Sequence, residues 1–178
     1  TIARPEGARN NPRPLVAHRS HRPLESPHQA ALNRLKAIVA EHGVRAGIEF
    51  LNGLSAHRFT AMYRFDQDTL RNRVFFDCEN PEVTGVDEIP VLASYCVFVR
   101  DSGTRFATTA ALEVRRLDGH AKQAHVQSYC GVPLRDREGR MFGSVCHFDF
   151  SPGSIAERDV SLMEELADLL QPGLRDVA

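Results

Sequence analysis

Cysteine and histidine side chains are the residues of this chain that could carry redox or metal chemistry. The stretch SYCGVPLRDREGRMFGSVCHFD contains Cys130 and Cys146, with His147 directly after the second cysteine. Two further cysteines, Cys78 and Cys96, precede it. A structural zinc site needs paired ligands such as Cys-x-x-Cys or clustered histidines, and this spacing does not supply them. No metal site is therefore expected, and the stretch is either the wall of a redox site or the wall of a binding pocket.

Other functional signatures are missing from the sequence. There is no glycine-rich phosphate loop and no nucleophile elbow. A net charge of -1 gives no general reason to expect nucleic acid or an anionic membrane as partner. No apolar run approaches the roughly 20 residues that span a bilayer, and the N-terminus lacks the apolar region of a secretory signal. We expect a cytoplasmic protein whose four cysteines are free thiols.

Composition divides the chain near residue 27. Residues 1–27 are rich in proline and arginine and poor in apolar side chains. Proline fixes the backbone and removes hydrogen-bond donors, and so little apolar surface cannot offset the entropy of ordering. We predict a flexible tail over residues 1–27. The rest, 28–178, is long enough for a single domain with one core.

Helical periodicity appears at both ends of that domain. The first helix is expected to begin at Ser26 and Pro27, a capping residue and a first-turn proline, and to be interrupted by Gly43. The last is expected to begin with a capping box of Ser154 and Glu157. The apolar stripes are Leu32, Leu35, Val39, Val44, Ile48 and Leu51 in the first helix, and Ile155, Leu162, Leu166 and Leu169 in the last.

Strand patterns fill the middle of the chain. RFTAMYRF places apolar side chains at every second position and LRNRVFFD follows across a polar turn, which predicts a hairpin. Residues 88–126 predict a strand running into a helix, a further strand and an irregular excursion. Residues 128–149 predict a second hairpin. The expected fold class is α+β, a central antiparallel sheet with the terminal helices on one face.

Both faces of the second hairpin are apolar. On the first strand Cys130 shares one face with Val132, and Tyr129 and Gly131 share the other. On the second strand Val145 shares one face with His147, and Cys146 and Phe148 share the other. A sheet that is apolar on both faces needs cover on both. The terminal helices can cover one face of the sheet, so the middle excursion must cover the other. Loops and short helices leave a cavity beneath them, and there we expect a ligand.

These segments resemble a known family. YCGVPLRDREGRMFGSVCHFD resembles the C-terminal strand pair of GAF domains, in which Tyr-x-Gly-x-Pro-Leu precedes a glycine turn and Gly-x-Leu/Val-Cys-x-x-Asp. LASYCVFVRDSGTRFATTAA is similar to the GAF segment in which a cysteine precedes a helix and a strand. The resemblance covers residues 29–171. It implies a small-molecule-binding sensory domain of bacterial-type signal transduction, with its pocket under the middle excursion.

The resemblance also implies where a ligand binds. Thr109 stands where many members have an aspartate, which removes a carboxylate from the site. The Cys96 and Cys146 thiols are interpreted as buried packing groups. No catalytic residue and no cofactor is assigned, and the ligand itself is left open. The expected ligand-binding residues are Cys96, Thr109, His125, Tyr129, Gly131, Cys146 and Phe148.

One enzyme is the alternative to a sensor, namely the thiol-dependent free methionine-(R)-sulfoxide reductase of the GAF type. Cys96 falls near one of that family's cysteines, but the lid segment GHAKQAHVQS has no cysteine where the catalytic thiol would sit. A bilin chromophore would also need a lid cysteine. We expect a non-enzymatic sensor, a homodimer through its terminal helices by way of Ala31, Ile38 and Met163. It would signal to a partner in trans or be part of a larger regulator.

Overall fold

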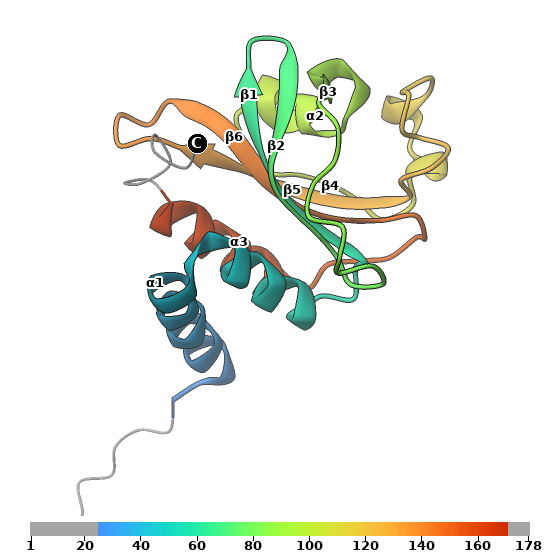
Figure 1. Cartoon of the computed structure of the whole chain (residues 1–178). Coiled ribbons are helices and arrows are strands. Elements are labelled where there is room, and N and C mark those ends of the chain that lie inside the picture. The colour runs from blue at the N-terminus through green and yellow to red at the C-terminus, as the bar shows by residue number, and fades with distance from the viewer. Residues whose placement is uncertain (1–24, 171–178) are drawn as a thin grey trace, which may run out of the picture.

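The computed structural model describes residues 25–170 and shows one antiparallel sheet of six strands between helical layers (Figure 1). The strands lie in the order β3-β2-β1-β6-β5-β4. The expected α+β class and both expected hairpins, β1–β2 and β5–β6, are confirmed. The elements are α1 (Pro27–Leu54), β1 (Phe59–Asp66), β2 (Thr69–Asp77), β3 (Ile89–Pro90), η1 (Val91–Ala93), α2 (Cys96–Ser102), β4 (Phe106–Thr108), η2 (Ala111–Glu113), η3 (Arg115–Leu117), β5 (Ser128–Arg135), β6 (Met141–Asp149) and α3 (Glu157–Leu169).

The sheet separates two apolar cores. Helices α1 and α3 cover one face, while α2 and the short 3-10 helices lie over the other (Figure 1). Cys130 and Val145 pack with the terminal helices, whereas Tyr129 and Cys146 belong to the second core. The expected division of the second hairpin is therefore confirmed, and β1 follows the same alternation.

Helix α1 begins and bends where the sequence indicates. The Ser26 hydroxyl accepts a hydrogen bond from the Gln29 amide at 3.1 Å, and Pro27 occupies the first turn. Gly43 has φ 84° and ψ -179°, a conformation that a side chain strongly disfavours, and the helix axis changes direction there (Figure 1). Only the part after Gly43 lies along the sheet.

Helix α3 differs from the expectation at its start and in its buried face. It begins at Glu157 behind Ala156, with no side-chain cap, and Glu157 instead pairs with Arg105 at 3.0 Å. The expected capping box was therefore wrong, since the glutamate pairs instead with a cation directly before β4. Met163 is fully buried in the core beneath the helices, so it cannot pair across a two-fold axis as expected.

Some expectations lie outside the described residues. The predicted flexible tail over 1–27 falls almost entirely before residue 25, and the end of the predicted domain falls after residue 170. Within residues 25–170, every helix is too short or too polar to cross a membrane.

A buried polar cluster ties α1 to the sheet centre. His147 is fully buried, and its Nδ1 lies 2.7 Å from the Thr60 hydroxyl. Asn52 on α1 donates to that hydroxyl at 2.9 Å and to the His57 carbonyl at 3.1 Å. Burial lowers the pKa of His147 from 6.5 to about 3, with the nearby His57 adding to the effect. The imidazole is therefore neutral in the folded protein.

This cluster predicts loss of stability in mild acid. Unfolded chains protonate His147 near pH 6.5, but the folded protein does so only near pH 3, so stability falls as pH drops through that window. We expect the free energy of unfolding to fall by about 1 kcal/mol between about pH 6 and about pH 5. Urea denaturation at several pH values measures it.

The control uses two histidine variants. His147→Asn should flatten the pH dependence, since it removes the titrating group. His42→Asn should keep it, because His42 is exposed on α1. An equal pH slope in both variants would contradict the assignment to His147.

Candidate ligand cavity

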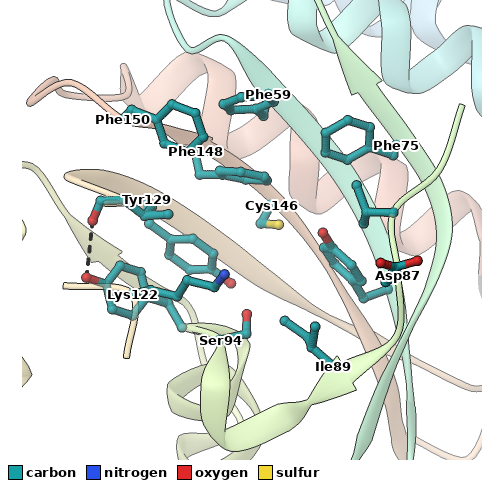
Figure 2. A pocket seen from close by; sticks show the side chains of 14 residues that line it. Phe59, Phe75, Asp87, Ile89, Ser94, Lys122, Tyr129, Cys146, Phe148 and Phe150 are labelled. Carbon is teal, nitrogen blue, oxygen red and sulfur yellow. Dashed lines mark hydrogen bonds between the residues drawn. The ribbon is translucent and has the colours of Figure 1, made fainter. Parts of the chain in front are cut away.

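A cavity of about 340 Å³ lies between the sheet and the segments that cover its second face (Figure 2). Its volume is at the lower end of the range for small-molecule pockets, about 300–1,000 Å³. Strands β1, β2, β5 and β6 form its floor, and the segments around β3, α2 and the lid (residues 118–127) form its roof. It is lined by Phe59, Tyr63, Phe75, Val86, Asp87, Ile89, Ser94, Tyr95, Lys122, Val126, Tyr129, Cys146, Phe148 and Phe150.

Aromatic rings dominate the walls. Phe59 stacks on Phe148 with ring centroids 4.8 Å apart and also contacts Phe150 at 4.9 Å. Tyr95 meets Tyr129 edge to face, with centroids 5.6 Å apart. The chain has three tyrosines and no tryptophan, and all three tyrosines line this cavity. Such a surface suits a flat apolar or aromatic ligand.

The rim of the cavity carries opposite charges. Val86 and Phe150 are 41% and 53% exposed, so the cavity opens beside them. Figure 2 shows Lys122, from the lid, and Asp87, from the loop before β3, on opposite sides of the cavity. Neither side chain makes an ion pair with any residue from 25 to 170. A ligand with a charged group could therefore be oriented at the mouth.

A hydrogen bond between two residues that line the cavity joins the lid to the start of α2. The buried Tyr95 hydroxyl donates to the Val126 carbonyl at 3.1 Å. The lid residue Gln127 donates from its side-chain amide to the Gln123 carbonyl at 2.7 Å. Burial raises the pKa of Tyr95, so this hydroxyl stays protonated and able to donate.

Behind the floor lies a cluster centred on the Cys96 sulfur. The Tyr129 hydroxyl donates to it at 3.3 Å and the Ser144 hydroxyl at 3.4 Å. Cys146 belongs to the same core, and the Cys96 amide donates to the Ser94 hydroxyl at 3.2 Å. The interaction with Cys146, followed by those with the serine and tyrosine hydroxyls, lowers the pKa of Cys96 against the opposing effect of burial. The same contact raises the pKa of Cys146, so the Cys96 sulfur holds any negative charge of the pair.

The seven residues expected to bind a ligand fall into three groups. Tyr129, Cys146 and Phe148 line the cavity, and Cys96 lies directly behind it. Thr109 and His125 are exposed and do not line it. Thr109 borders a separate shallow groove beside α3.

Gly131, the seventh, is buried but makes room for a side chain of the protein. A Cβ there would overlap the Tyr129 hydroxyl and lie 2.8 Å from the ring carbon that carries it. The glycine lets the Tyr129 ring lie along its own strand, toward Cys96.

Most lining residues were not expected from the sequence. Phe59 and Tyr63 were detectable, because both alternate along β1 on the face away from the helices. Lys122, Asp87 and Ser94 lie in irregular segments, where no periodicity marks which side chains turn inward. Within residues 25–170, no three histidine, cysteine or acidic side chains gather as metal ligands would.

Comparison with known proteins identifies related sequences. The family model described as the GAF domain matches residues 49–171. A cyclic di-GMP phosphodiesterase of Pseudomonas aeruginosa is 33% identical over 89 residues, which are 48% of this chain and 15% of that protein. The chain therefore spans only a small part of this relative.

Solved structures share the fold. The GAF domain of an Acinetobacter phosphoenolpyruvate-protein phosphotransferase has TM-score 0.67 and 14% identity, covering 82% of this chain and 91% of that one. A free methionine-R-sulfoxide reductase of Neisseria meningitidis, solved with its substrate, has TM-score 0.64 and 18% identity, covering 81% and 86%. The chromophore-binding domain of a Stigmatella aurantiaca phytochrome has TM-score 0.66 and 11% identity, covering 89% and 63%. At these identities the likeness concerns the fold alone.

Proposed function

The chain belongs to the GAF domain family, and from this premise we propose that it is a non-catalytic sensory domain that binds a small molecule in the aromatic cavity. Ligand occupancy would be its regulatory signal. The observation that carries the proposal is the cavity itself, about 340 Å³ in volume, open at one rim and walled by seven aromatic side chains.

The walls favour a particular ligand chemistry. Stacked phenylalanine and tyrosine rings favour a flat apolar body, while the few polar groups inside can fix its orientation. Lys122 is half-buried and Asp87 is exposed, so solvent screens an ion pair less at Lys122 than at Asp87. An anionic group beside Lys122 therefore contributes more binding free energy than a cationic group beside Asp87. We propose an aromatic or heteroaromatic ligand whose acidic group lies at the mouth.

The direct test is native mass spectrometry of freshly purified protein, compared with its denatured mass, because such a cavity can retain its ligand. Tyrosine emission provides a second measurement, since all three tyrosines line the cavity and the chain has no tryptophan. Quenching by small aromatic acids would report binding there. If no molecule is retained and no such acid changes the emission, the proposal is wrong.

Lys122→Ala tests the charge preference. We expect it to weaken binding of anilinonaphthalene sulfonate (ANS), an aromatic anion, roughly two- to fivefold, as for loss of a partly exposed ion pair. Binding of the uncharged parent, N-phenylnaphthylamine, should not change. Fluorescence titration measures both. Lys36→Ala is the matched control, because Lys36 is exposed on α1. If Lys122→Ala weakened the binding of both probes equally, an ionic role of Lys122 would be contradicted.

We also propose that the domain is a cytoplasmic homodimer with a signalling partner. Ile38 is half-buried on α1 without joining either core, so this helix still has an apolar side chain to offer a second copy. The four cysteines, none in a disulfide, fit a reducing compartment. A monomer by light scattering at tens of micromolar would contradict the dimer.

The second candidate is a free methionine-(R)-sulfoxide reductase, one of whose members shares the fold. The neighbouring Cys96 and Cys146 thiols beside the cavity favour it. The lid, residues 118–127, carries no cysteine. Thiol-dependent consumption of free methionine sulfoxide, lost in Cys96→Ser, would replace the sensor proposal with this one.

A further inference from the structure

Two cysteines meet at the floor of the cavity. Cys96 comes from α2 and Cys146 from β6. The Ser144 hydroxyl, two residues before Cys146 on the same face of β6, donates to the Cys96 sulfur at 3.4 Å, which makes the two cysteines neighbours in the second core. We propose that this pair is a redox site that hydrogen peroxide, or another small hydroperoxide, converts to a disulfide within one chain. The inference goes beyond ligand sensing and does not depend on which ligand the cavity binds.

The surroundings of Cys96 suit a reactive sulfur. The Tyr129 and Ser144 hydroxyls donate to its sulfur, and the Ser94 hydroxyl and the Cys146 thiol lie beside it, so all four groups can donate to a thiolate. Only the thiolate attacks a peroxide, so donors that stabilise it favour reaction. The lowered pKa of Cys96 agrees with this arrangement.

The cavity gives an oxidant access to a pair that is otherwise buried. Cys96 and Cys146 are each only 1% exposed. However, Cys146, Ser94 and Tyr129 line the cavity, so the Cys96 sulfur lies one side chain behind its wall. Hydrogen peroxide is close to water in size and can enter where a larger oxidant would be excluded.

The proposed reaction balances without another reactant. The Cys96 thiolate attacks one peroxide oxygen, the O–O bond breaks, and hydroxide leaves, which gives a sulfenic acid on Cys96. The Cys146 sulfur then attacks the Cys96 sulfur and displaces hydroxide. The Cys146 proton and one from solvent convert the two hydroxides to water, and the proton originally on Cys96 has gone to solvent. Two thiols and one peroxide thus become one disulfide and two waters.

The other two cysteines differ in environment. Cys130 lies on the opposite face of the sheet, where burial raises its pKa to about 11. The residue Cys78 is exposed, but its sulfur is partly covered. This partial burial, followed by the negative charges of Asp77 and Glu79, raises the pKa of the Cys78 thiol. Within residues 25–170, neither sulfur accepts a hydrogen bond from a hydroxyl group, as the Cys96 sulfur does. The disulfide should therefore form between Cys96 and Cys146 before the others react.

The experiment uses the full chain, reduced and then exposed to hydrogen peroxide. We expect the alkylatable thiols of the denatured protein to fall from four to two, with loss of the mass of two hydrogen atoms. Peptide mapping should join Cys96 to Cys146, and dithiothreitol should restore four thiols. Tyrosine emission should change with the same rate, because Tyr129 loses its thiolate acceptor.

Variants separate this site from the rest of the chain. Cys146→Ser should stop at a Cys96 sulfenic acid, which dimedone traps, and Cys96→Ser should form no disulfide. Cys130→Ser removes an equally buried thiol on the other face and should react as the parent does. If Cys96 and Cys146 stay alkylatable while Cys78 alone is oxidised, or if Cys130 supplies the partner, the proposal is overturned. ANS binding under reducing conditions tests the ligand cavity separately.

Discussion

A Val126→Trp variant is expected to lose about 100-fold in affinity for ANS, equivalent to about 2.7 kcal/mol. Val126 is 8% exposed and faces the cavity from the lid. Its backbone is held by the Tyr95 hydroxyl at 3.1 Å, so the lid cannot easily move away from a larger side chain. The indole would occupy the space that an aromatic probe needs. Fluorescence titration measures the loss.

Leu112→Trp is the matched control for that variant. Leu112 lies in η2, in the segment that leads to the lid, but is 66% exposed and does not line the cavity. Because the parent has no tryptophan, each variant has one indole emission of its own. Blue-shifted emission in Val126→Trp and red-shifted emission in Leu112→Trp would show where each ring lies. Unchanged ANS affinity with a buried Val126→Trp indole would mean that the probe binds elsewhere.

The faces of the strands could be predicted because side chains alternate along a strand. Within each strand of the hairpin over residues 128–149, alternation fixed which side chains share a face, and the family resemblance placed Tyr129 and Cys146 on the same one. The same rule placed Phe59 and Tyr63 together on β1. The apolar character of both faces then required a cover, and the cavity lies beneath that cover.

Which side chains of the loops reach the cavity could not be predicted in the same way. Lys122 and Asp87 lie in segments without periodicity, and their placement on opposite sides of the cavity depends on how two loops cross the sheet. The contact between Cys96 and Cys146 is also a tertiary event, because α2 must lie across β6 to make it. Gly131 was expected among the ligand-binding residues, but the space that it leaves is taken by the Tyr129 ring, whose path depends on the tertiary structure.

The buried face of α3 shows the limit of helical periodicity. Leu162 and Leu166 were expected in the core and are there, but Met163 is also fully buried. The helix packs against both α1 and the sheet, so its apolar arc is wider than one stripe. A pattern that fits a single contact surface therefore left Met163 outside the core.

Gly143→Ala is expected to have the largest effect on stability, about 3 kcal/mol, at the upper end of the usual cost of overpacking. Gly143 on β6 pairs with Arg64 on β1, in the central ladder of the sheet. A Cβ there would overlap the Tyr63 carbonyl oxygen and lie 3.2 Å from the carbonyl carbon. These are backbone atoms, so relief requires the two strands to separate. The melting temperature should fall by roughly 6–12 °C for a chain of this size.

The same variant should also weaken the cavity, because β1 carries Phe59 and Tyr63 and β6 carries Cys146 and Phe148, and the strands share its floor. Gly53→Ala is the control, since a Cβ there meets no atom within 4 Å and the residue lies inside α1. That substitution should be neutral or stabilising by up to about 1 kcal/mol, as alanine favours a helix over glycine. Urea denaturation followed by tyrosine emission and by circular dichroism measures both variants. Equal midpoints for Gly143→Ala and the parent would show that β1 and β6 can move apart at little cost, and the cavity floor would then be adaptable.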